Sequence, residues 1–321
     1  MTDQANTTAG WPELPSEDWS ETVEALHLWT QIVGKIRLGY APWINHSWGV
    51  PLYVSTRGLR TSMIPHGSDA VELEFDFIDH ELGIHTTAGQ GRSIQLEAQP
   101  VAEFHRSVLT SMESVGIPVT INPMPSEIPG AIPFDRDTAV RPYDPSHASA
   151  LWRALVQIDR VLTRFRADFK GKASPVHFFW GSFDLAASRF SGRTAPPHPG
   201  GIPNFPDDVA QEAYSHEVTS AGFWPGSRSA PEPIFYSYAY PTPEGFSDAD
   251  VEPAEAFWLD EIGEFALPYA TVVATEDPDA TLLSFFDSTH AAAAELARWD
   301  RAVLEAERPE GPDWWRNRPH H

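Results

Sequence analysis

Apolar residues recur at helical spacing in an early stretch of the chain, residues 17–39. Leu26, Trp29, Val33 and Ile36 are separated by three or four positions, which places them on one side of a helix. A continuous apolar stripe of this kind is typical of a helix that packs one face against a core. The pattern therefore predicts a long amphipathic helix over this range.

A second helix is predicted directly after Asp144 and Pro145. Aspartate is a favoured N-cap residue, and proline is favoured at the first helical position because its missing N–H is not needed there. Gly171 supplies a plausible C-terminal stop. The apolar stripe of this helix consists of Leu151, Leu155, Ile158, Leu162, Phe165 and Phe169.

Short aromatic-rich segments follow both helices and indicate strands. Each segment opens with a proline, Pro51 in the first case and Pro175 in the second. Further along, LEFDFIDHELGI and AFWLDEIGEFAL alternate apolar and polar positions around an acidic turn, which predicts two β-hairpins. Each hairpin leads to a helix opened by proline, at Pro100 and Pro278.

The order helix, strand, hairpin, helix thus occurs twice, and we expect an α+β fold made of two diverged copies of one unit with antiparallel sheets and a pseudo-twofold relation. Chance similarity is the alternative, because few residues are identical. The expected boundaries are a tail at 1–10, a first repeat at 11–140, a second repeat at 141–308 that contains an insertion at 201–254, and a C-terminal tail at 309–321.

Several blocks of the chain are distinctive as sequences: WTQIVGKIRL, NHSWGVPLYVSTRGL, FDFIDHELGI, SPVHFFWGSFDLA, RFSGR, PPHPGG and YSHEVTSAGFWPG. Together they resemble a bacterial family defined only as a domain of unknown function, DUF 5996. The resemblance covers roughly residues 11–304 and implies no activity and no catalytic residues.

Composition narrows the function classes. The net charge of −23 argues against nucleic acid and anionic membranes as partners, since both are negatively charged. No cysteine is present, which excludes disulfides and thiolate chemistry. No apolar run approaches the roughly 18 residues of a membrane span, and no signal peptide is visible, so a cytoplasmic location is expected.

Candidate chemistry concentrates in the second copy. His177 lies among aromatic residues on a predicted strand, where it is a catalytic candidate or a core residue with a satisfied ring. Asp184 follows a glycine and is expected either to cap a turn or to orient a catalytic partner.

An Arg-Phe-Ser-Gly-Arg turn follows, with Arg189, Ser191 and Arg193. Between residues 151 and 193, basic residues outnumber acidic ones eight to three. Two guanidinium groups around a hydroxyl suit a carboxylate or phosphate, so the turn is a candidate site for a small anionic molecule. The alternative is that these arginines form structural pairs with the surplus carboxylates.

Further histidines raise the question of a metal. His216 and Glu217 are catalytic candidates, and Trp180 and Trp224 are expected to form walls of the substrate site. His177, His198 and His216 are candidate ligands of a single divalent metal, although no short ligand spacing such as HExxH supports them. No nucleotide-binding motif occurs, so the cofactor stays unknown.

Three functions remain open at this point. The first is an enzyme that acts on a small anionic molecule through a His/carboxylate site and the arginine turn. The second is a ligand-binding protein without catalysis, and the third is a partner-binding scaffold. The sequence favours the first without fixing a reaction class or an oligomeric state.

Overall fold

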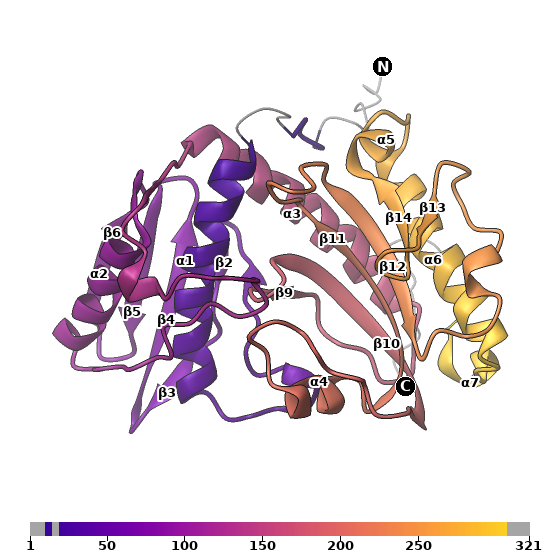
Figure 1. Cartoon of the computed structure of the whole chain (residues 1–321), viewed down its shortest axis with the longest axis horizontal. Helices are drawn as coiled ribbons and strands as arrows, with labels where there is room; N and C mark the ends of the chain where they lie inside the picture. The colour runs from indigo at the N-terminus through magenta and orange to yellow at the C-terminus, as the bar shows by residue number, and fades with distance from the viewer. Residues whose placement is uncertain (1–9, 15–18, 307–321) are drawn as a thin grey trace, which may run out of the picture.

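The computed structural model describes residues 10–14 and 19–306. Both expected tails, and the first two residues of the expected first helix, lie outside these ranges, apart from Gly10 at the end of the N-terminal tail. The described part combines helices with antiparallel sheets, so the α+β class is confirmed (Figure 1). No helix in the described part combines the length and apolar character needed to cross a membrane.

The first half of the chain forms a sheet in the strand order β1-β2-β4-β5-β6, with β3 paired to β4. The predicted hairpin is present, because β4 and β5 pair in antiparallel register from Val71–Thr86 to Asp76–Glu81. Helices α1 and α2 pack on each other and against this sheet. The elements are α1 (Trp19–Tyr40), η1 (Asn45–Ser47), β1 (Tyr53–Val54), β2 (Gly58–Arg60), β3 (Ile64–His66), β4 (Asp69–Asp76), β5 (Glu81–Thr86), β6 (Gly91–Gln95), β7 (Gln99–Pro100) and α2 (Val101–Ser114).

A connecting segment leads from α2 to the second half and carries η2 (Phe134–Arg136) and β8 (Val140–Arg141), which pairs with β7. The second half forms a six-stranded sheet in the order β13-β14-β12-β11-β10-β9. Its elements are α3 (Pro145–Ala167), β9 (His177–Phe179), β10 (Asp184–Thr194), α4 (Asp207–Ala213), β11 (His216–Trp224), β12 (Ile234–Tyr240), η3 (Phe246–Asp248), β13 (Phe257–Leu259), β14 (Glu264–Pro268), α5 (Tyr269–Val273), α6 (Pro278–Leu296) and α7 (Arg301–Leu304).

The predicted start signals of the helices in the second half are confirmed, but α3 ends at Ala167 with Asp168 as its C-cap, so Phe169 and the expected stop at Gly171 lie beyond the helix. Asp144 caps α3 by accepting a hydrogen bond from the Ser146 N–H at 2.7 Å, and Pro278 lies in the first turn of α6. The second hairpin is β13–β14. Residues 201–254, expected as an insertion, supply α4 and the central strands β11 and β12.

The two sheets meet at their edge strands. Leu52 and Phe178 exchange two backbone hydrogen bonds of 2.9 Å, which join the β1 edge to the β9 edge. Buried apolar residues from both halves form one continuous core, in which Trp29 and Phe104 stack beside the first sheet. The halves are therefore held together by backbone pairing as well as by packing.

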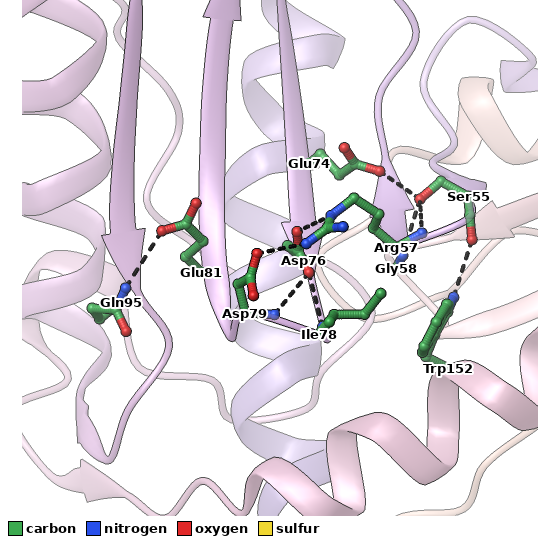
Figure 2. A network of polar contacts seen from close by, with 10 residues as sticks. All are labelled: Ser55, Arg57, Gly58, Glu74, Asp76, Ile78, Asp79, Glu81, Gln95 and Trp152. Atoms are coloured by element: carbon green, nitrogen blue, oxygen red, sulfur yellow. Dashed lines mark hydrogen bonds and ion pairs between the residues drawn. The ribbon is translucent and has the colours of Figure 1, made fainter.

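The polar face of the first sheet carries a network of satisfied charges, shown in Figure 2. Arg57 donates to Asp76 and, at 2.6 Å, to Asp79. Ser55 donates to Glu74 at 2.5 Å, and Trp152 of α3 donates to the Ser55 carbonyl at 3.0 Å. The acidic residues Glu72, Glu74 and Asp76 share one side of β4, with Asp76 buried under Arg57.

Candidate functional site

A cavity of about 270 Å³ lies on one face of the second sheet. Side chains alternate across a strand, so paired strands present alternate residues to each face. On the other face, Leu185, Phe223 and Phe235 are buried, and α3 and α6 cover them. The cavity face therefore carries the remaining residues of each strand, and those lining the cavity include Asp184, Ala186, Ser188, Phe190, Val218, Ser220, Tyr236 and Tyr238.

The roof of the cavity comes from α4 and from η1. Trp43 donates its indole N–H to Glu212 of α4 at 2.7 Å, and His46 of η1 hydrogen-bonds the carbonyl of Ala213 at 2.8 Å. Lys172 lies 2.5 Å from the other ring nitrogen of His46, so that nitrogen accepts and the Nδ1–H donates to Ala213. These contacts hold the roof over the sheet.

Asp184 is a buried carboxylate of the cavity that is held by hydrogen bonds. It lies at the start of β10 after Phe183, whose φ of 61° makes the tight turn from β9. Its carboxylate accepts hydrogen bonds from the hydroxyls of Ser182 and Tyr236. Burial raises the pKa of Asp184 to about 6, and the two hydroxyl donors oppose that rise.

Glu127 brings a second carboxylate from the connecting segment. Its φ of 62° is a strained conformation for a residue with a Cβ atom, and its N–H donates to the Pro203 carbonyl at 2.8 Å. A Cβ atom at Gly181 would lie 1.9 Å from Glu127 Oε1, so only glycine leaves room for this carboxylate. Burial, and next the charge of Asp184, raise the pKa of Glu127 to about 7.

Glu264 of β14 belongs to the same electrostatic group. Burial and the charge of Asp184 raise the pKa of Glu264 to about 8. Within the described residues, none of Asp184, Glu127 and Glu264 has a cationic side chain within 4.0 Å. The cavity thus contains two carboxylates, Asp184 and Glu127, with no ion pair within 4.0 Å among the described residues, and Lys35 acts on Glu127 only from a longer distance.

Lys35 of α1 reaches this region from the side. Its ammonium donates to the Ser126 hydroxyl at 3.0 Å, and Ser126 lines the cavity next to Glu127. Burial lowers the pKa of Lys35 to about 8, although the Glu127 carboxylate opposes the change. The amine therefore loses its proton far more readily than an exposed lysine.

Of the residues expected from the sequence, Asp184 and Trp180 line the cavity. His177 does not, because the rings of Trp48, Tyr53 and Phe179 surround it. It is fully buried, and neither ring nitrogen has a hydrogen-bond partner among the described residues. Burial lowers the pKa of His177 to about 3, so its ring is neutral.

The arginine turn is separated from the cavity by the sheet itself. Arg189 faces α3, where its guanidinium lies 3.5 Å from the ring centre of Phe165 and donates to the Phe165 carbonyl. Arg193 donates to Glu217 at 2.6 Å and to the Ala297 carbonyl at 2.6 Å. Ser191 also donates to Glu217, at 2.9 Å. The expected convergence of these groups with His177 is absent, since strand parity sends them to the opposite face.

The three candidate metal ligands do not gather. His198 stacks on Tyr214 at 4.7 Å and its Nδ1 accepts the Gly200 N–H, whereas His216 lies beside His46 at 5.9 Å between ring centres. Within residues 10–14 and 19–306, no group of three or more His, Asp or Glu residues is placed to hold a metal. The expected three-histidine site is therefore corrected.

Trp224 ends β11 and is not a lining residue of the cavity. Sequence reasoning also missed Lys35, Ser126, Glu127 and Tyr236. One signal was present: Gln31 and Lys35 are polar residues four positions apart in a helix whose residues from Leu28 to Arg37 are all buried. Two polar groups on the same side of such a helix need polar partners.

A family model matches residues 11–306, and its description is a family of unknown function, DUF5996. The chain belongs to this family. No curated protein and no solved structure matched the chain. Membership in DUF5996 thus confirms the resemblance in the sequence and assigns no reaction, so the function of this family member must be argued from the cavity.

Proposed function

We propose that this DUF5996 protein binds a small molecule with an apolar body and a cationic amine, and transfers protons to or from it through Asp184 and Glu127. One observation carries the proposal. Asp184 and Glu127 line an aromatic-walled cavity, and within the described residues neither has a cationic partner within 4.0 Å.

The charge of the cavity favours a cation. A buried carboxylate without a counter-ion is costly, and a ligand ammonium beside it removes that cost. The faces of tryptophan and tyrosine attract cations as well, and Trp48, Trp180 and Tyr238 line the cavity. The same rings provide apolar surface for the body of the ligand.

The pKa values favour proton transfer near neutral pH. The values are about 6 for Asp184 and about 7 for Glu127. An acid or base works best when its pKa lies close to the operating pH, so the pair can hold one proton and exchange it.

The anionic ligand expected from the sequence stays a prediction, and the geometry favours a cation instead. Arg189 and Arg193 are engaged with Phe165, Glu217 and the end of α6. Two residues carry over from the sequence expectation: Asp184, now proposed as a base where a partner-orienting or turn-capping role was expected, and Trp180 in the wall of the cavity.

A matched pair of probes tests the ligand class. At pH 8 we expect 2-phenylethylamine to raise the melting temperature of the full chain, and 3-phenylpropanoate to leave it unchanged. Asp184→Asn and Glu127→Gln should remove most of the shift, while Glu72→Gln on the first sheet should retain it. Stabilisation by the carboxylate, or equal shifts in all variants, would overturn the proposal.

Proton linkage tests whether the two carboxyl groups exchange protons when the amine binds. Amine binding should lower both carboxyl pKa values, so at pH 7 the complex should release protons. Calorimetry in two buffers of different ionisation enthalpy measures that release. Release that persists in Asp184→Asn together with Glu127→Gln would contradict a proton-transfer role and leave the non-catalytic binding alternative.

We also propose that the two halves arose from one duplicated unit. The order of helix, edge strand, hairpin and helix supports it, as does the pairing of the β1 and β9 edges through Leu52 and Phe178. Superposition of residues 19–114 on 145–296 should match α1 with α3 and α2 with α6. A best fit that pairs other elements would contradict duplication.

A further inference from the structure

Lys35 and Ser126 form an amine–hydroxyl pair at the edge of the cavity. Lys35 Nζ lies 3.0 Å from Ser126 Oγ. Lys35 is 7% exposed and Ser126 is 8% exposed, so bulk water has little access to the pair. Ser126 itself lines the cavity, and a molecule bound there can reach its hydroxyl.

Gln31 fixes the backbone of Ser126 in front of the amine. The Ser126 N–H donates to Gln31 Oε1 at 2.7 Å, and Gln31 Nε2 donates to the Ser126 carbonyl at 2.9 Å. Gln31 and Lys35 are one helical turn apart on α1, so both side chains leave the helix on the same side. One helix face thus holds the serine and presents a base to it.

We propose that Ser126 is a nucleophile activated by Lys35, and that the cavity hydrolyses a small ester or amide through an acyl-serine. The proposal rests on the proposed function only in that the substrate enters the same cavity. Serine paired with lysine is a known variant of the nucleophile–base arrangement, in which a desolvated lysine replaces histidine.

The reaction balances with the substrate and water alone. Neutral Lys35 accepts the Ser126 hydroxyl proton while Oγ bonds to the substrate carbonyl carbon. The bond to the leaving alcohol or amine then breaks, and the Lys35 ammonium returns its proton to that group. A water molecule, deprotonated by Lys35, attacks the acyl-serine, and the Ser126 oxygen takes the proton back as the acid leaves.

The surroundings of Lys35 allow it to act as a base. From the connecting segment it faces Ser126 and Glu127, and from the β9–β10 turn the Trp180 ring at 5.8 Å. Among the described residues its ammonium has one hydrogen-bond acceptor for three N–H bonds. With a pKa of about 8, about a tenth of the amine is neutral at pH 7.

The pair has an alternative, purely structural reading. The ammonium then anchors the connecting segment, and the charge and the hydrogen bond matter but deprotonation does not. Lys35→Arg discriminates between the two readings, because arginine keeps the charge and the donor yet does not lose its proton at these pH values.

Covalent labelling of the full chain tests the inference. Diisopropyl fluorophosphate should add one diisopropylphosphoryl group to Ser126, seen by intact mass and peptide mapping. The labelling rate should rise with pH and level off above a pKa of about 8. Lys35→Met and Lys35→Arg should slow it by about 100-fold or more, and Ser126→Ala should abolish the adduct.

Matched controls are Lys170→Met and Ser114→Ala, which change exposed residues of the same types. They should label at the native rate, and circular dichroism should show that every variant is folded. No adduct at Ser126, or unchanged labelling in folded Lys35→Arg, would overturn the inference. If amines fail to bind but Ser126 labels, the proposed ligand class fails alone; if amines bind and Ser126 does not label, the dyad fails alone.

Discussion

Both sheets present acidic residues on one face, but the two faces differ in the partners that these carboxylates have. On the first sheet, Asp76 accepts from Arg57 and from the backbone N–H groups of Ile78 and Asp79 (Figure 2). On the second sheet, the Asp184 carboxylate accepts from the hydroxyls of Ser182 and Tyr236 and from its own backbone N–H. Within the described residues no cation lies within 4.0 Å of it.

The pKa values record this difference. Burial alone would raise the pKa of Asp76, but the hydrogen bonds from Asp79 and Arg57 hold it below its ordinary value. Burial raises the pKa of Asp184 to about 6. A charged group that is fully paired contributes to stability, whereas one left without a counter-ion costs stability and is available to a ligand.

Covering elements explain why the cavity described above lies on the polar face of the second sheet and not on that of the first. The first sheet's polar face meets solvent, where arginines such as Arg57 and Arg60 can turn toward the acids. The second sheet's polar face lies under α4, η1 and the segment that carries Glu127. Enclosure removes water from the carboxylates, and it leaves a cavity in place of a second layer of side chains.

The largest expected loss of stability comes from replacing Gly222 on the second sheet, and Gly83 on the polar face of the first sheet is its matched control. A Cβ atom at Gly222 would lie 2.6 Å from the Leu185 carbonyl oxygen and 2.5 Å from the Tyr236 ring, so Gly222→Ala should cost about 2–4 kcal/mol. A Cβ atom at Gly83 meets only the movable His85 ring closely, at 2.9 Å, and Gly83→Ala should cost less than about 1 kcal/mol. Urea unfolding measures both, and equal costs would show that the two faces are packed alike.

The next largest change in stability is expected from replacing one aspartate on each sheet, and the two changes should have opposite signs. The folded pKa of Asp184 exceeds its ordinary value of 3.8, so its charge penalty is absent below pH 4 and complete above about pH 6. Asp184→Asn should therefore stabilise the protein by roughly 1–2 kcal/mol at pH 8. The pKa of Asp76 is lowered in the folded protein, so its charged form contributes stability at pH values above its ordinary pKa. Asp76→Asn should therefore destabilise the protein by about 1 kcal/mol at pH 8. Chemical denaturation at pH 8 and pH 4 measures both, and loss of stability in both variants at pH 8 would contradict the comparison.

A smaller effect is expected at His177, which lies beside the cavity without joining it. Its folded pKa of about 3 is below its ordinary value, so the unfolded chain binds a proton between those pH values and stability falls with acid. His177→Phe should stabilise by about 1 kcal/mol, more at pH 5 than at pH 7, because both ring nitrogens are unpaired among the described residues. Thermal unfolding at the two pH values tests it. Loss of amine binding with an intact fold would instead place His177 in the site.

The smallest effect is expected from the exposed ion pairs, where the two sheets should behave alike. Arg193 pairs with Glu217 and Arg60 pairs with Glu72, and both arginine side chains are about half exposed. Arg193→Ala and Arg60→Ala should each cost less than about 1 kcal/mol, and salt should reduce the cost. A large loss of ligand binding in Arg193→Ala alone would restore the anion site expected from the sequence.

Local signals predicted the main helices and both hairpins, but neither the central strands β11 and β12 nor the site. The stripes of α1 and α3, the Asp144 cap and both hairpins were readable because they depend on residues close in the chain. The error at the arginine turn was avoidable, because Asp184 and Arg189 are five positions apart on one strand and must face opposite sides. Lys35 could have been found as a polar residue in an otherwise buried stretch of helix, whereas no sequence pattern indicated Ser126 or Glu127.

The sequence by itself determined the class of the fold, the acidic charge, and the alternation that gives the second sheet one apolar and one polar face. Only the tertiary structure decided which polar residues meet. Ser126 lies 91 positions from Lys35 along the chain, and Tyr236 lies 52 positions from Asp184. Contacts over such separations depend on how the whole core packs, and hydrophobic patterning is silent about them because burial is not directional.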